Sequence, residues 1–376
     1  MNAIARIAAA GLAPLCVVPA ARAAAPARDA VKLEPFGLVF ADAAWLDGAA
    51  AKGRDDHEAD LRLAELGIDV KHGAFTFRAS YDFAADGAWR DVGGFFKQDG
   101  WFLGAGQFKE PASLDKLSIP GGTVFLESAR FTKAFGLNRR LGVWAGRYDK
   151  EWSVTLNASS GALDGDDHYA SGTGQTSLGG RATWSPAFGE ARLHLGAYAR
   201  TLNYDGSGVK PGASPYAELA AKTLYADLTA KSPTPASDSL MGGVEAAWSA
   251  PGVFIAAEIA AIDFDTQAGS RDAAGGYVQA SWAITGEQRR HVPAKGAFDR
   301  IVPSRPRSQG GPGAWELAGR VDHLDLGAGL DSTAYAAGVT WTPERDLRLM
   351  INYVAERGRT DVGDSDVLMV RLQAGF

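Results

Sequence analysis

The segment VLMVRLQAGF at the C-terminal end of the sequence alternates between two faces with a period of two residues. This period is the geometry of a β-strand, in which successive side chains point to opposite sides. One face stays apolar up to the last residue, a position where fraying usually favours polar side chains. That face holds Leu368, Val370, Leu372, Ala374 and Phe376, whereas Met369, Arg371, Gln373 and Gly375 share the other.

The same alternation recurs along the chain, for example over residues 75–83, 191–203, 315–323 and 347–355. Together these segments predict roughly sixteen strands of about ten residues, the length of a tilted membrane-spanning strand. An even number of strands is typical of bacterial outer-membrane barrels. The predicted strands begin near residues 31, 59, 75, 89, 101, 140, 152, 175, 191, 239, 253, 276, 315, 333, 347 and 367.

A closed barrel explains the two faces better than a soluble fold does. In an outer-membrane barrel the apolar side chains meet lipid, and the polar side chains line a lumen filled with water. The polar faces here carry many arginines and carboxylates, and the net charge of −6 argues against a nucleic-acid partner. A soluble β-protein with its tryptophans in the core is the alternative. Tryptophans gather at predicted strand ends, as interfacial girdles do: Trp89, Trp101, Trp152, Trp184, Trp248 and Trp341.

The connections between the predicted strands differ in length. Such a difference is typical of barrels that carry short turns at the periplasmic end and long loops at the outer end. Short turns are predicted at 71–74, 98–100, 251–252 and 344–346, and long loops at 110–138, 161–174, 205–238, 285–313 and 358–365.

The N-terminal residues have the pattern of a secretory signal peptide, with a basic Arg6, an apolar stretch at 7–18 and a small-residue cleavage site at 21–23. We expect residues 1–23 to be the signal peptide, cleaved near 23–25. Residues 24–58 are then an N-terminal segment with the first strand, and residues 59–376 the remainder of the barrel. Cys16, which lies in the signal after Leu15, is the only cysteine, so we expect no disulfide and no lipid anchor.

Three stretches resemble the phosphate-selective porin O and P family of Gram-negative outer membranes. They are residues 275–326, which contain TGE and GAWEL, residues 338–376, which contain GVTWTPERDL and LMVRLQAGF, and residues 106–131, GQFKEPASLDKLSIPGGTVFLESARF. The resemblance implies a sixteen-stranded antiparallel barrel with an inward-folded pore loop, usually a homotrimer. It also implies passive uptake of small solutes, anions such as phosphate, without catalysis or a cofactor. Phe376 resembles the terminal aromatic that the barrel-assembly machinery recognises.

The sequence departs from the family pattern at residues that bear on selectivity. Residues 62–64 are Arg-Leu-Ala where the family has Arg-Arg-Ala, and residues 126–128 are Leu-Glu-Ser where it has Met-Glu-Arg. Residues 113–115 are Ser-Leu-Asp where it has Gly-Leu-Glu. The resemblance therefore implies a porin, while a preference for phosphate in particular does not follow from these residues.

Selectivity in a pore comes from charged side chains at its narrowest part. By resemblance, the pore constriction loop carries Lys109, Glu110, Asp115, Lys116, Glu127, Arg130 and Lys133; an ordinary solvated outer loop is the alternative. The period of two also predicts a lumen-facing set, whose charges could instead pair across strands and stiffen the wall. This set is Arg78, Asp82, Arg181, Arg192, Arg200, Glu245, Glu258, Glu316, Arg320, Asp322, Arg348 and Arg371.

Signals for chemistry are weak. Residues 113–116 match the S-x-x-K pattern of serine acylases but lack its companion motifs, and the six histidines show no metal-ligand spacing. We therefore expect no enzyme activity, no metal and no cofactor. The expected partners are outer-membrane lipid, lipopolysaccharide and small solutes. An outer-membrane barrel enzyme or adhesin is the alternative function, and it would need a nucleophile and base at one rim, or long adhesive loops.

Overall fold

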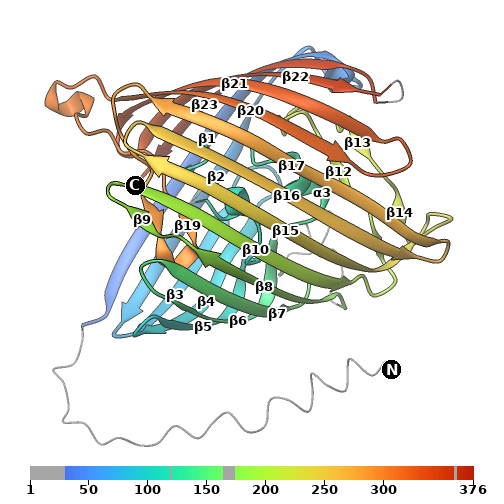
Figure 1. Ribbon diagram of the computed structural model, residues 1–376, viewed down its shortest axis with the longest axis horizontal. Coiled ribbons are helices and arrows are strands. Elements are labelled where there is room, and N and C mark those ends of the chain that lie inside the picture. Colours follow the sequence, from blue (N-terminus) through green and yellow to red (C-terminus); the bar gives the residue numbers. More distant parts are fainter. Residues whose placement is uncertain (1–29, 119–120, 164–173, 360–361) are drawn as a thin grey trace, which may run out of the picture. The chain divides into compact units, whose positions relative to one another are not determined.

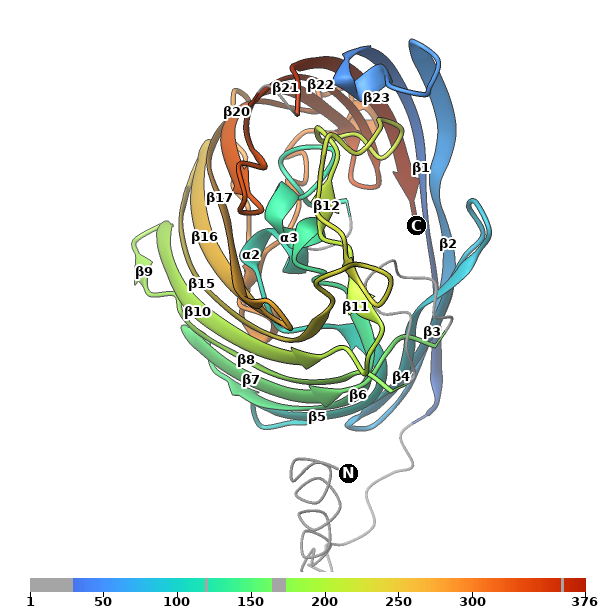
Figure 2. The same cartoon turned by 90° about the vertical axis from the view of Figure 1, so that its right-hand side faces the viewer.

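The computed structural model describes residues 30–118, 121–163, 174–359 and 362–376. Residues 32–376 form one compact unit, in which sixteen long antiparallel strands close into a barrel (Figures 1 and 2). Closure is made by β1 (Lys32–Gly48), which pairs with both β2 (His57–His72) and β23 (Ser365–Gly375). The predicted all-β barrel of sixteen strands is confirmed, whereas the predicted signal peptide lies outside the described residues.

The other long strands pair with their neighbours in chain order. They are β3 (Phe75–Asp82), β4 (Ala88–Gln98), β5 (Trp101–Lys109), β6 (Arg139–Tyr148), β7 (Trp152–Ser159), β8 (Thr176–Trp184), β10 (Ala191–Asn203), β15 (Ala236–Ala250), β16 (Val253–Thr266), β17 (Gly269–Ala283), β20 (Ala314–Asp325), β21 (Asp331–Glu344) and β22 (Leu347–Gly358). The two-residue β9 (Ala187–Phe188) extends the pairing of β10.

Most strands begin within about three residues of the predicted positions, as their period of two indicates. The exception is β17, which begins at Gly269 and not near 276. Its first residues include Asp272, which lies on the outward face opposite Asp263 of β16. Because these carboxylates interrupt the apolar face, the alternation of polarity does not mark this end of the strand.

The two faces of the wall are arranged as predicted. On β16, Ile259 points outward with 65% of its surface exposed, whereas the adjacent Glu258 points inward and is 1% exposed. The same contrast separates Leu156 from Asn157 on β7. An apolar exterior around a polar interior is the arrangement expected where lipid surrounds the barrel.

Consecutive strands run in opposite directions, so successive connections lie alternately at the two ends of the barrel. The short turns at 73–74, 99–100, 251–252 and 345–346 share the end at which β1 begins. Residues 110–138 and 204–235 connect strands at the opposite end. The placement of 285–313 with the long loops is wrong, because β17 ends and β20 begins at the short-turn end. Loop length alone does not reveal the end of the barrel.

Several connections carry small elements, and Figure 2 shows α2 and α3, from the connection between β5 and β6, within the ring of strands. Residues 110–138 contain α2 (Leu114–Leu117) and α3 (Arg130–Ala134). Residues 204–235 contain β11 (Gly208–Val209), β12 (Gly212–Ala213), β13 (Leu224–Tyr225) and β14 (Leu228–Thr229). Residues 285–313 contain β18 (His291–Val292), η2 (Pro293–Lys295), β19 (Ala297–Phe298) and η3 (Arg307–Gln309), while η1 (Ala49–Ala51) follows β1.

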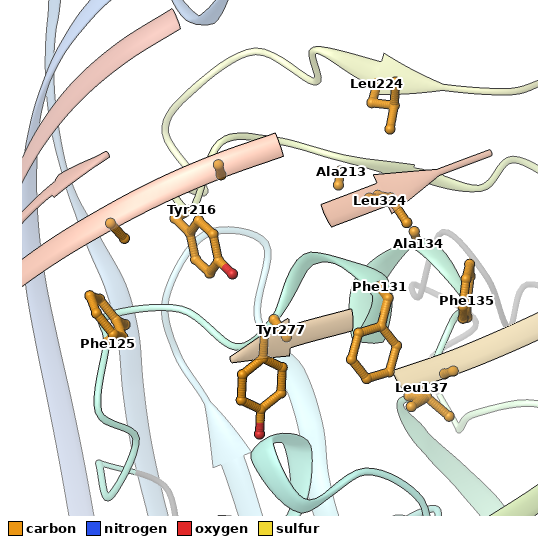
Figure 3. Close-up of a cluster of buried hydrophobic side chains, with 14 of the residues drawn as sticks. Phe125, Phe131, Ala134, Phe135, Leu137, Ala213, Tyr216, Leu224, Tyr277 and Leu324 are labelled. Carbon is orange, nitrogen blue, oxygen red and sulfur yellow. The ribbon is translucent and has the colours of Figure 1, made fainter. Parts of the chain in front are cut away.

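An apolar cluster fills the space between these connections and the wall (Figure 3). Phe131 of α3 and Phe135, which directly follows α3, are four residues apart, so they share one face, and their ring centroids lie 5.8 Å apart. Phe131 reaches the wall at Gly275 of β17, where an added Cβ would lie 2.6 Å from the Phe131 Cβ. From the other side, Leu224 of β13 is fully buried in the same cluster. The barrel therefore has a hydrophobic core inside its polar lumen.

Candidate functional site

Arg130, the first residue of α3, is held by carboxylates of the wall. Its Nε lies 2.9 Å from Asp322 Oδ1 on β20, and its Nη1 donates to Glu356 on β22 and, over 2.8 Å, to Ser332 on β21. Burial disfavours the charge, but Asp322 and Glu356 outweigh burial and raise the pKa of Arg130 above its ordinary value. Arg130 is therefore a permanent cation that anchors residues 110–138 to three strands.

The start of the same connection is fastened by α2. Glu258 Oε2 of β16 accepts a hydrogen bond from the Leu114 N–H over 2.7 Å, close to the N-terminus of α2. Asp115 lies 3.2 Å from the Arg320 guanidinium and accepts a hydrogen bond from the Ala129 N–H over 2.7 Å. These wall residues bind the connection, so they are not free to contact a solute.

The middle of the connection is tied to the strands near the chain's C-terminus. Arg371 Nε of β23 lies 2.7 Å from Asp42 Oδ1 of β1, and its Nη2 lies 2.8 Å from Glu127 Oε1. Arg348 of β22 donates to the Gly121 carbonyl and, over 3.2 Å, to the Thr123 carbonyl. The two arginines thus bridge residues 121–127 to the wall.

The ends of the connection meet at Glu110. Its carboxylate lies 3.2 Å from Arg200 Nη1 and 3.3 Å from Arg140 Nε. Burial would raise the pKa of Glu110, but Arg200 and Arg140 outweigh burial and lower it. Arg200 also donates to the Phe135 carbonyl over 2.6 Å. Glu110 is therefore a buried anchor and does not face a passage.

Residues 285–313 are fastened in the same way from the short-turn end. Arg289 lies 2.8 Å from Glu316 Oε2 of β20. Arg181 of β8 donates to the Lys295 carbonyl over 2.8 Å and pairs with Glu245 of β15. These contacts engage three more members of the predicted lumen set.

A cavity of about 400 Å³ lies between residues 110–138, residues 204–235 and the wall. Its lining in the described part of the chain is unbalanced in charge, with eight basic and three acidic side chains. The charged lining residues that lie on strands belong to β2, β4, β5, β6 and β23. Those of β2, β4, β5 and β6 lie near the end of the barrel that carries residues 110–138 and 204–235. The basic residues are Arg62, Arg90, Lys109, Lys116, Arg130, Lys133, Arg139 and Arg371, and the acidic residues are Asp115, Glu127 and Glu218.

Some of the predicted site residues line this cavity, and others bind the inner connections to the wall. Six of the seven residues predicted for the constriction line the cavity, and Glu110 does not. Of the lumen-facing set only Arg371 lines it, although every member lies on an inward face. Arg78 pairs with Asp69 over 2.6 Å, and Arg192 donates to the Lys150 carbonyl over 3.3 Å. Asp82 accepts a hydrogen bond from the Ala64 N–H over 2.9 Å. The roles of these residues in selectivity stay predictions.

Sequence reasoning missed several residues of the cavity. Arg90 and Arg139 lie at strand ends, next to bulges or long connections, where a period of two is hard to follow. Glu218 lies among the Gly, Pro, Ser and Ala residues of 204–235, without any motif around it. No pattern in the sequence could have placed it near β2 and α3.

Within the described residues, no group of His, Cys, Asp and Glu side chains is suited to a metal ion.

Comparison with known proteins gives a family and a fold. The profile of the phosphate-selective porin O and P family matches residues 37–376. An uncharacterized protein of Caulobacter vibrioides is 32% identical over 272 residues, which are 67% of this chain and 53% of that protein. The chain thus spans about half the length of this relative.

Solved structures of outer-membrane proteins share the fold at low sequence identity. The anion-selective porin from Comamonas acidovorans superposes with a TM-score of 0.60 at 10% identity, covering 92% of this chain and all of that one. The trimer form of OmpT from Vibrio cholerae gives 0.59 at 10% identity, covering 93% and 100%. The outer-membrane channel DcaP of Acinetobacter baumannii gives 0.56 at 13% identity, covering 92% and 97%.

Proposed function

The chain belongs to the phosphate-selective porin O and P family, and on that premise we propose that it is a passive diffusion channel that favours small anions. Its family and its closed sixteen-stranded barrel support an outer-membrane diffusion channel rather than an enzyme. Both support an outer-membrane location. No helix among the described residues is long and apolar enough to cross a membrane.

The excess of cations on the cavity lining is the observation that carries the anion preference. Several carboxylates that pair with these cations are absent from the lining, among them Asp91 beside Arg139 and Asp42 beside Arg371. Basic side chains therefore outnumber carboxylates on the lining by eight to three, and Glu218 is the most exposed of the three acids. Close charges dominate the field at such a site, because the Coulomb energy falls with distance and with screening.

Four of the basic residues on the lining come together from separate elements. Lys109, at the end of β5, donates to the Lys116 carbonyl of α2 over 2.8 Å. Arg90 of β4 and Arg139 of β6 lie near enough for their charges to act on Lys109. Clusters of this kind bind inorganic anions through charge-assisted hydrogen bonds. We assign phosphate and chloride to the same passage, since both are small anions.

A homotrimer is part of the proposal. The support is the related fold of the Vibrio cholerae OmpT, which was solved in a trimer form. Chemical crosslinking and native mass measurement of the detergent-extracted protein test it. A species of three chains is expected, and a monomer alone would contradict the proposal.

The test of function is single-channel recording in a planar bilayer. Under a KCl gradient, we expect stepwise conductance with a reversal potential biased toward chloride. Phosphate added to one side should reduce the chloride current in a concentration-dependent way. A reversal potential biased toward potassium would reject the anion preference while leaving the channel function intact. A folded protein without conductance steps would reject the channel.

A further inference from the structure

Glu218 is an acidic residue on the cavity lining and lies next to two of the basic residues there. Its carboxylate accepts a hydrogen bond from Lys133 Nζ of α3 and lies 3.7 Å from Arg62 Nη2 of β2. The side chain is 41% exposed, and each partner is 32% exposed. The group is therefore in contact with water, unlike the Arg130 anchor, whose ion-paired side chains are 0–1% exposed.

Glu218 is also the most accessible acid of the three on the lining. Asp115 has 2% of its side chain exposed and is bonded to Arg320 and Ala129. Glu127 has 20% exposed and is bonded to Arg371. Of the carboxylates on the described lining, an entering ion therefore contacts mainly that of Glu218.

The backbone around Glu218 is held in place on both sides. Tyr216 donates its hydroxyl proton to Asp322, and the Ala221 N–H donates to the Ala50 carbonyl over 2.9 Å. Ala217 and Ala220 are buried against the same cluster. A carboxylate on a fixed backbone acts at a constant position in the passage, as a selectivity group requires.

We infer that Glu218 is a specificity-determining residue that weakens the anion preference of the channel. This inference rests on the proposed function. The carboxylate offsets the charges of Lys133 and Arg62, and it repels anions that approach them. Because the Coulomb energy is proportional to the product of the charges, the effect on divalent phosphate exceeds the effect on chloride.

The test compares the intact channel with Glu218→Gln, which keeps the shape of the side chain and removes its charge. The chloride-to-potassium permeability ratio should rise by roughly two- to fivefold at 0.1 M KCl, and less at 1 M, where screening is stronger. Block by phosphate should strengthen by a larger factor. Lys133→Gln should move the permeability ratio in the opposite direction.

Asp227→Asn is the matched control, since Asp227 belongs to the same connection, is exposed, and does not line the cavity. It should leave the permeability ratio unchanged. An unchanged ratio in folded Glu218→Gln would overturn the inference, whatever Lys133→Gln does. The sign of the wild-type ratio tests the proposed function separately, because the shift between variant and wild type does not depend on that sign.

Discussion

Arg130 and Asp322 meet inside the barrel with 2.9 Å between Nε and Oδ1, although 192 residues separate them in the chain. The contact is doubled, because the Arg130 backbone N–H also donates to Asp322 Oδ2 over 3.1 Å. It joins the connection that occupies the lumen to the wall that surrounds it. Arg130 was predicted to set selectivity, but its charge is paired with a carboxylate of the wall. Arg130 therefore anchors residues 110–138 to the barrel.

Arg130→Gln should destabilise the protein and loosen the passage. The change leaves two buried carboxylates without their cation, which costs about 3–5 kcal/mol. Lys133→Gln on the same helix removes a more exposed pair and should cost less than about 1 kcal/mol. Urea titration of both variants in detergent gives the free energies of unfolding, and single-channel noise should increase for Arg130→Gln only. Equal losses in the two variants would contradict the anchor role.

Arg139→Gln should lower the chloride-to-potassium permeability ratio. The variant removes a cation of the lining and leaves Asp91, now 2.7 Å from the Arg139 Nε, without that partner. Arg147 is the matched control, because it lies on the outer face of the same strand, 5.0 Å from the Trp101 ring centroid. Reversal potentials should shift for Arg139→Gln and stay constant for Arg147→Gln. A shift in both variants would point to an indirect effect on the barrel.

The contribution of Glu218 should be independent of pH over most of the accessible range. Burial would raise the pKa of this carboxyl, but Lys133 and Arg62 outweigh burial and lower it to about 2. A lowered pKa means that the carboxylate is charged, and its ion pairs stabilise the fold, until the pH falls toward 2. The difference in reversal potential between wild type and Glu218→Gln should therefore be constant from pH 7 to pH 4 and fall to about half near pH 2. A difference that fades between pH 7 and pH 4 would contradict this pKa.

Gly275→Ala should displace α3 from the wall. The new methyl group would lie 2.6 Å from the Phe131 Cβ, which is too close for two carbon atoms without a shift of the helix. Gly319→Ala on β20 is the control, since nothing lies within 4 Å of the position of its Cβ. Thermal unfolding and single-channel conductance should change for Gly275→Ala alone. Wild-type behaviour of both variants would mean that α3 adapts at no cost.

Much of the barrel was predictable because a strand that separates lipid from water must alternate its side chains. The pairs Ile259 and Glu258, or Leu372 and Arg371, show this rule at single positions. The rule fails at Gly269, where carboxylates on the outward face hide the start of β17. A different inference, from loop length, fails for residues 285–313, because the end of the barrel at which a connection lies depends on the number of strands before it.

The site was predictable only in part. Lys109, Lys116 and Lys133 were placed near the passage by resemblance to a family, and they line the cavity. Glu218 had no comparable signal, since its partners Lys133 and Arg62 are remote in the sequence. The charges of Arg320 and Asp322 were expected on the lumen, but their bonds to residues 110–138 could not be foreseen.

The sequence by itself determined most of the strands and their two faces, because both depend on alternation between neighbouring residues, and resemblance to a porin family implied the closed barrel. Only the tertiary structure decided which charges anchor the inner connections and which ones face the cavity. Arg130 and Glu218 both line the cavity, yet the side chain of Arg130 is buried between two carboxylates and that of Glu218 is in contact with water. The physical reason is that ion pairing and burial are set by residues far apart in the chain, which closure of the barrel brings together.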